Sequence, residues 1–269
     1  MTVLDLSNYD SDIIGNAMCL KVGGVTGAIV GCQRPDTARQ QIDALRAVGI
    51  ATPGVYAFLY FGIDSTGQTG TAIKVAQEKG IRRVWLDVES SGTNERAGIT
   101  PPERIAELNN CLAMVRNAGL EPGIYTYEPY WRSQMADTHD FAALPLWFAN
   151  YGTNDPNNPR PPVNSVSFGG WTSVTIHQYS STIRVCGRER DHNYVFEGED
   201  DMTPEEVNKL VEKFVGATFP AYIEAYFSGG FSARNGVVSD LNPEGKGPIK
   251  PWLADIPNLT TLPQVAADQ

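Results

Sequence analysis

Two acidic residues, Asp87 and Glu89, end an apolar segment with a single residue between them. The segment Val84-Trp-Leu-Asp-Val-Glu-Ser90 has the pattern of a buried strand, and side chains two positions apart on a strand point to the same face. Placing two carboxyl groups together at the end of such a strand costs free energy, which favours a functional role. Paired carboxyl groups about 5 to 9.5 Å apart are the reacting groups of most glycosidases.

Each acid also has a simpler interpretation. Asp87 alone fits a helix cap or an ion-pair partner of Arg82 or Arg83, and Glu89 alone fits a surface residue. Two acids on one face at the end of an apolar strand favour the catalytic interpretation.

Strand-like and helix-like segments alternate around this pair. The predicted strands cover residues 3–7, 27–32, 55–61, 83–88, 123–127, 145–150, 173–179 and 192–195, and the predicted helices cover residues 11–22, 35–48, 69–78 and 101–118. Several strands are apolar on both faces, as parallel strands covered by helices are. Five β-α repeats followed by strands without evident helices predict an α/β fold, a modified TIM-like (β/α) barrel of about eight strands.

The predicted barrel also indicates where the reacting groups lie. In barrels of this kind the reacting groups lie at the C-terminal ends of the strands, and Asp5, Asp87 and Glu89 lie at or near such ends. The polar, glycine-rich segment 64–70 is expected to form a loop at the rim.

The character of the chain changes after residue 196. We expect a barrel over residues 1–196, an acidic linker over 197–202, a helical segment over 203–228 and an extended tail over 229–269. The segment Thr203-Pro-Glu-Glu206 has the pattern of a helix start with a capping box. The tail is too rich in Gly, Pro and Asn to build a core alone, so we expect it to dock on the barrel or on a partner subunit.

Composition narrows the function classes. The formal net charge of −10 argues against broad nucleic-acid binding, which needs a basic surface. No run approaches the roughly 20 apolar residues that span a bilayer, and no signal peptide is expected. The wide spacing of the four cysteines predicts free, mostly buried thiols. The three histidines lack zinc-ligand spacing, so neither a metal nor another cofactor is expected.

The motifs resemble those of glycoside hydrolase family 25, the Chalaropsis-type lysozymes common among phage endolysins. The resemblance covers about residues 3 to 196, and seven motifs follow the order of the family. They are Asp5-Leu-Ser-Asn-Tyr9, Gly54-Val-Tyr-Ala-Phe58, Trp85-Leu-Asp-Val-Glu89, Gly123-Ile-Tyr-Thr-Tyr127, Pro145-Leu-Trp-Phe-Ala149, Gln178-Tyr179-Ser180 and Asp191-His-Asn193.

The resemblance implies a muramidase, which hydrolyses the β-1,4 bond between N-acetylmuramic acid and N-acetylglucosamine in peptidoglycan. It makes Glu89 the proton donor and Asp87 the neighbouring charge that raises the pKa of Glu89. Asp87 would also either stabilise the sugar cation or help to position the N-acetyl group of the substrate. Asp5 and Asp191 match the other two acids of the cleft. Asp5 also fits a turn former, and Asp191 also fits a solvated loop within the charged run 188–191.

The resemblance also suggests substrate contacts. Tyr60, Tyr127 and Trp147 are expected to form walls on which sugars stack, and Tyr56 and Gln178 are further candidates for binding substrate. The second strand departs from the family pattern, because it ends in Gly31-Cys-Gln-Arg-Pro35.

The resemblance implies peptidoglycan as the partner and a site of action at the bacterial cell wall, as a phage virion component or a released lysin. Residues 202–269 are then expected to contact other virion subunits. One alternative is a structural or receptor-facing virion protein that uses the barrel as a scaffold, since a fold does not guarantee its chemistry. A weaker alternative is a module that binds another glycan.

Overall fold

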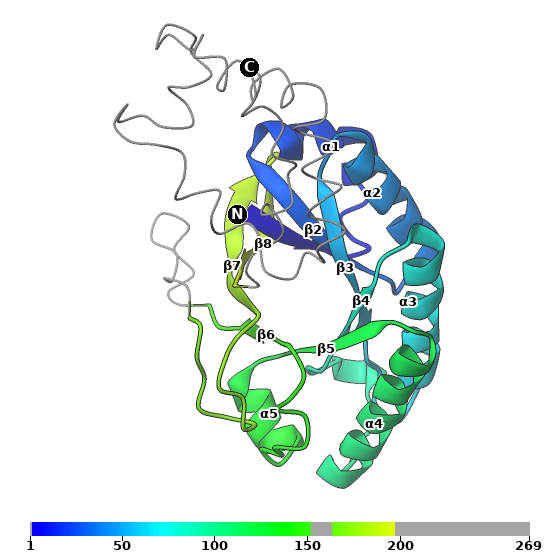
Figure 1. The fold of residues 1–269 in the computed structure, drawn as a ribbon, viewed down its shortest axis with the longest axis vertical. Coiled ribbons are helices and arrows are strands. Elements are labelled where there is room, and N and C mark those ends of the chain that lie inside the picture. Colours follow the sequence, from blue (N-terminus) through cyan, green and yellow to red (C-terminus); the bar gives the residue numbers. More distant parts are fainter. Residues whose placement is uncertain (1, 152–162, 197–269) are drawn as a thin grey trace, which may run out of the picture. The chain divides into compact units, whose positions relative to one another are not determined.

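The computed structural model describes residues 2–151 and 163–196. Within these ranges, eight strands close into a barrel whose neighbours follow the order of the chain (Figure 1). The strands are β1 (Thr2–Leu6), β2 (Val25–Gly31), β3 (Ala51–Phe58), β4 (Arg83–Asp87), β5 (Glu121–Thr126), β6 (Leu146–Ala149), β7 (Ile176–Val185) and β8 (Arg188–Val195). Strands β1 to β7 pair in parallel, whereas β8 is antiparallel to both β7 and β1.

Helices follow each of the first five strands. They are α1 (Ile13–Val22), α2 (Pro35–Ala47), α3 (Ser65–Lys79), α4 (Pro101–Asn117) and α5 (Glu128–Gln134), with a short 3-10 turn at Gly92–Asn94 before α4. The predicted α/β barrel is therefore confirmed. The sequence did not locate α5, because seven residues are too few to display a helical apolar period.

The predicted rim loop over residues 64–70 is wrong, because α3 begins at Ser65. In its first turns the threonine hydroxyl groups bond back within the helix: Thr69 Oγ1 donates to the Ser65 oxygen at 2.8 Å and Thr71 Oγ1 to the Gly67 oxygen at 2.9 Å. The carboxylate of Glu107 accepts hydrogen bonds from the Gly62 amide and the Ser65 hydroxyl. The polar composition thus serves a helix start rather than a loop.

Large aromatic side chains fill the interior of the barrel. Trp85 and Trp147 meet edge to face with ring centroids 5.7 Å apart, and Tyr125 contacts Trp147 at 4.7 Å. Gly123 leaves room for them, since a Cβ at this position would lie 2.4 Å from the Trp85 ring. This layer supports the C-terminal ends of the parallel strands, which form the mouth of the barrel.

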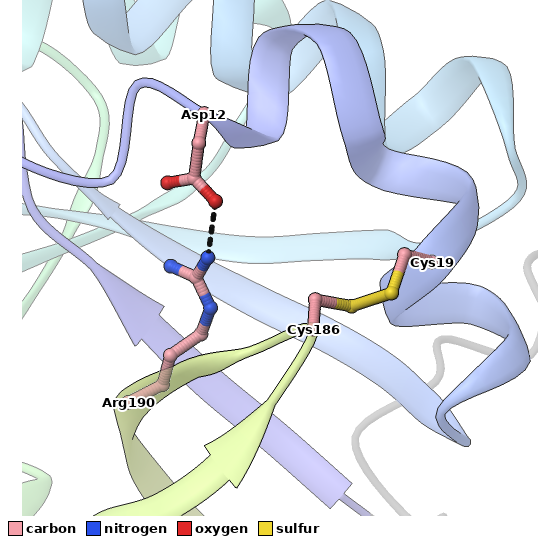
Figure 2. Close-up of a disulfide and its surroundings, with 4 residues drawn as sticks. All are labelled: Asp12, Cys19, Cys186 and Arg190. Carbon is pink, nitrogen blue, oxygen red and sulfur yellow. Dashed lines mark hydrogen bonds and ion pairs between the residues drawn. A yellow bond between two sulfur atoms is a disulfide. The ribbon is translucent and has the colours of Figure 1, made fainter.

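The prediction of four free cysteines is wrong for one pair. Cys19 in α1 and Cys186 in the turn between β7 and β8 form a disulfide, with Cα atoms 5.9 Å apart (Figure 2). Sequence spacing could not indicate this pair, because 167 positions separate the two residues and only the closed barrel brings them together. Cys32 and Cys111 are free and buried as predicted.

The outer part of the β7–β8 hairpin lies along α1. The register of the two strands shifts between Gln178 and Ile183, so the hairpin bends there. Beyond the bend, Arg190 bonds Asp12 just before α1 and Cys186 bonds Cys19 in its second half (Figure 2).

Three predictions fall on residues 197–269, outside the described ranges: the linker, the helical segment and the docking tail. Among the helices of the described ranges, none has the length and hydropathy needed to cross a membrane.

Candidate active site

The structure brings together the four acids that the sequence singled out. Asp5 lies in β1 opposite Asp191 of the antiparallel strand β8. Asp87 is the last residue of β4, and Glu89 follows two positions later. Asp87 and Glu89 interact electrostatically with Asp5, as does Asp191, so the four carboxyl groups share one site at the mouth of the barrel.

Two side-chain amides hold Asp5. Gln178 Nε2 and Asn193 Nδ2 each donate to Asp5 Oδ2 at 2.8 Å. The indole N–H of Trp147 donates to Asn193 Oδ1 at 2.7 Å, so the NH₂ group of that amide faces Asp5. Because each amide has a fixed orientation, Asp5 is held in one position.

The amide of Gln178 is oriented in the same way. The hydroxyl groups of Tyr125 and Tyr151 donate to Gln178 Oε1 at 2.8 and 2.6 Å. Burial, followed by repulsion from nearby carboxylates, raises the pKa of both tyrosines, which keeps them as donors.

Burial raises the pKa of all four acids. The pKa of Glu89 rises to about 7, first because of burial and then because of the charge on Asp5. The pKa of Asp87 lies well above its usual range, because burial and the charges of Glu89 and Asp5 oppose its ionisation. A cluster of this kind retains protons near neutral pH.

Asp5 and Asp191 divide their roles. Burial raises the pKa of Asp5 to about 6, opposed by its hydrogen bonds from Asn193, Gln178 and Asp191. Burial raises the pKa of Asp191 to about 9, and both the charge of Asp5 and the hydrogen bond to it add to the effect. At neutral pH the pair therefore favours a protonated Asp191 that donates to an ionised Asp5.

Two of the simpler interpretations do not hold: the ion pair of Asp87 with Arg82 or Arg83, and the solvated loop around Asp191. Arg82 and Arg83 pair with Glu121 at the start of β5, away from Asp87. Asp191 belongs to a strand rather than to a solvated loop.

Three predicted substrate contacts are corrected. Trp147 is 2% exposed, so its ring fills the barrel and offers no face for a sugar to stack on. Tyr56 and Gln178 are 7% and 2% exposed and lie in the same buried layer. A barrel interior must be filled by side chains. Gln178 holds Asp5 directly, Trp147 does so through Asn193, and Tyr56 packs edge to face on Trp147.

Tyr60 and Tyr127 are half-buried at the ends of β3 and β5, and their contact with substrate stays a prediction. Tyr60 meets Phe58 edge to face, with centroids 5.7 Å apart. Tyr127 borders an open cavity of about 380 Å³ beside Glu89. Its lining residues are Ser90, Glu95, Tyr127, Pro129, Tyr130, Ser133 and Gln134.

Sequence reasoning missed several residues of the site. Asn193 was quoted only as the last residue of the motif over residues 191–193, yet its amide bonds Asp5 as well as the Val3 oxygen, the latter at 3.3 Å. Tyr125 and Tyr151 were not singled out as site residues, although Tyr125 belongs to the motif over residues 123–127 and Tyr151 directly follows the predicted strand over residues 145–150. Across residues 2–151 and 163–196, no group of three or more His, Cys, Asp or Glu side chains is arranged to hold a metal ion.

Comparisons with known proteins identify the family and the fold. Residues 4–188 match the profile of Glycosyl hydrolases family 25. A relative named probable GH family 25 lysozyme 3, from Dictyostelium discoideum, is 26% identical over 166 residues, which is 60% of this chain and 33% of the relative. The chain therefore spans a third of the length of that curated relative.

Two solved structures share the fold. A family 25 glycosyl hydrolase from Bacillus anthracis aligns with a TM-score of 0.59 at 16% identity, covering 75% of this chain and 91% of that one. The modular Cpl-1 endolysin, solved with a peptidoglycan analogue, aligns with a TM-score of 0.51 at 20% identity, covering 75% of this chain and 56% of that one.

Proposed function

The chain belongs to glycosyl hydrolase family 25, and on this basis we propose that it is a muramidase that hydrolyses the β-1,4 bond between N-acetylmuramic acid and N-acetylglucosamine. The observation that supports the proposal most directly is the cluster of Asp5, Asp87, Glu89 and Asp191 at the barrel mouth. A merely structural scaffold gains nothing from four buried carboxyl groups that oppose one another's ionisation.

We assign the proton donor to Glu89. Its pKa of about 7 leaves a large protonated fraction at neutral pH, and it is less buried than Asp87. The Glu89 carboxyl protonates the glycosidic oxygen as the bond from that oxygen to the sugar C1 breaks. A water molecule then adds to C1 and returns a proton to the Glu89 carboxylate, which restores the acid.

The neighbouring carboxyl groups stabilise the charge that develops on the sugar. Asp5 has a lower pKa than its partner Asp191, and two amide groups donate hydrogen bonds to it. An oriented carboxylate close to the reacting carbon stabilises an oxocarbenium-like transition state without reorganising. The charge that, after burial, keeps a proton on Glu89 is that of Asp5. The sequence assigned this part to Asp87, but burial and the charges of Glu89 and Asp5 oppose the ionisation of Asp87 itself.

The first prediction concerns pH. Glu89 must carry a proton to act, and its pKa is about 7, so release of reducing ends from purified peptidoglycan should fall as pH rises through about 7. The measurement is the initial rate of reducing-end release by the wild type between about pH 4 and 8. Binding to peptidoglycan without release at any pH in this range contradicts the muramidase proposal and favours a glycan-binding scaffold.

We further propose that the protein works outside the reducing cytoplasm, at the bacterial wall, as a virion component or a released lysin. The Cys19–Cys186 disulfide supports an oxidising location, and the likeness to the endolysin of phage Cp-1 supports the lysin role.

In a virion component, residues 202–269 would contact other virion subunits. Deleting them should spare hydrolysis but remove the protein from purified particles, as followed by mass spectrometry; absence of the full chain from particles contradicts a virion role.

A further inference from the structure

Arg190 is a buried cation beside the acid cluster that the proposed reaction does not use. We propose that Arg190 is a positioning residue: its ion pairs with Asp10 and Asp12 tie the loop after Asp5 to the strand that carries Asp191, and thereby fix the two paired carboxyl groups against each other. The inference rests on the proposed function, because it gives Arg190 a part in the same hydrolysis.

The geometry of Arg190 is that of a fixed anchor. Its side chain is 0% exposed, and Nη2 lies 2.6 Å from Asp12 Oδ2 (Figure 2). The other terminal nitrogen, Nη1, pairs with Asp10. A guanidinium removed from water must keep anionic partners, so this pair cannot exchange partners as surface pairs do. Arg190 directly precedes Asp191 in β8, so movement of one moves the other.

Asp10 transmits this restraint to the loop after Asp5. One carboxylate oxygen of Asp10 pairs with Arg190, while the other accepts hydrogen bonds from the Ser7 amide at 2.9 Å and the Ser7 hydroxyl at 3.0 Å. The buried amide of Gln41 also donates to the Ser7 oxygen at 2.9 Å. The loop therefore begins at Ser7, two residues after Asp5, and its Asp10 is held by the ion pair with Arg190.

Arg190 also compensates a charge that acts on both acids. The charge of Asp10 raises the pKa of Asp5 and of Asp191. Without Arg190, that charge is uncompensated and both pKa values rise further. The charge of Glu89 also raises the pKa of Asp191. The other titratable groups that face the pair are Asp87, Tyr56, Tyr125 and Tyr151, whose pKa values are raised by the charge of Asp5 or Asp191.

Arg188 supplies a matched control on the same strand. It bonds Asp12 Oδ1 at 2.8 Å and the Tyr9 oxygen at 3.2 Å, but its side chain is 54% exposed. It forms a similar ion pair in water, where the pair is weak, and it makes no bond to Asp10.

The experiment compares Arg190→Gln, Arg190→Lys, Arg188→Gln and the double variant Arg190→Gln with Asp10→Asn. The first readout is NMR titration of the Asp5 and Asp191 carboxyl groups in the ligand-free protein, which needs no hydrolysis. Arg190→Gln should raise both apparent pKa values by about half a unit or more. Arg190→Lys should restore part of the shift, Arg188→Gln should cause none, and the double variant should return both values to the wild-type level or below.

The second readout is kinetic. Arg190→Gln should lower kcat about tenfold while KM changes less than twofold, because a displaced carboxyl group impairs the reaction more than binding.

If Arg190→Gln does not fold, the Lys variant and the double variant decide by the same criteria. Unchanged pKa values in a folded Arg190 variant, or the same shift in Arg188→Gln, overturn the proposal. A wild type that hydrolyses nothing refutes the muramidase function alone, since the titration still decides the role of Arg190.

Discussion

Replacing Glu89 by glutamine should lower kcat for peptidoglycan hydrolysis by about 10²- to 10⁴-fold, the usual contribution of a positioned proton donor. Glutamine has the same shape but no proton to donate to the leaving oxygen. KM should change little, because the substitution removes an interaction made only in the transition state. The measurement is reducing-end release from purified peptidoglycan at several substrate concentrations.

The same variant should be more stable than the wild type at high pH. The pKa of Glu89 is raised from 4.5 to about 7 in the fold, so the wild type loses stability as pH rises from about 4.5 to about 7 and the buried group ionises. Glutamine has no charge to bury. Urea unfolding at pH 8 should therefore favour the variant, and the difference should disappear below about pH 4.5.

Glu121→Gln is the matched control, since Glu121 lies at the start of β5 and pairs with Arg82 and Arg83 away from the acids. It should leave kcat and KM unchanged. If Glu89→Gln keeps more than a tenth of the wild-type rate, then another member of the cluster is the proton donor, and Asp191, with a pKa of about 9, becomes the candidate.

Removing the Cys19–Cys186 disulfide should have the largest effect on stability. The bond joins residues 167 positions apart, and crosslinks that close long loops contribute about 3 to 5 kcal/mol by restricting the unfolded chain. In a fold of this size such a loss lowers Tm by roughly 10 °C. The outer β7–β8 hairpin would also lose its covalent link to α1.

The measurement is thermal unfolding of the wild type and of Cys19→Ser with Cys186→Ser, each with and without reductant. Reductant should lower the Tm of the wild type and leave that of the double variant unchanged. Cys111→Ala, which removes a free buried thiol, should respond to reductant as the wild type does. Four titratable thiols in the unreduced, denatured wild type would show that the bond does not form.

Local pattern was enough to predict much of the fold. The helix predicted over residues 101–118 is α4, which begins at Pro101, and Glu103 Oε2 accepts from the Thr100 amide at 2.8 Å and from its hydroxyl at 2.7 Å. The apolar strand before Asp87 predicted a parallel strand with its acids at the C-terminal end. These features depend on neighbours along the chain, which a sequence displays directly.

The sequence did not show how deeply each side chain is buried or which residues distant in the chain contact each other. Trp147 was expected in a cleft wall and fills the barrel instead, because strand alternation gives two faces but does not say which layer of the interior a side chain reaches. Gln178 and Asn193 meet on Asp5 from strands β7 and β8, more than 170 positions away in the chain. Sequence spacing alone cannot predict a contact of this kind.

The sequence by itself determined the chemical type of the site, a set of four carboxyl groups in an α/β barrel of glycosyl hydrolase family 25. Only the tertiary structure decided the protonation of those groups, since the pKa of a carboxyl group depends on burial, on neighbouring charges and on donors that the closed barrel brings together. The same closure pairs Cys19 with Cys186 and sets Arg190 between Asp10 and Asp12. Residue types are properties of the chain, whereas electrostatic environment and crosslinking are properties of its fold.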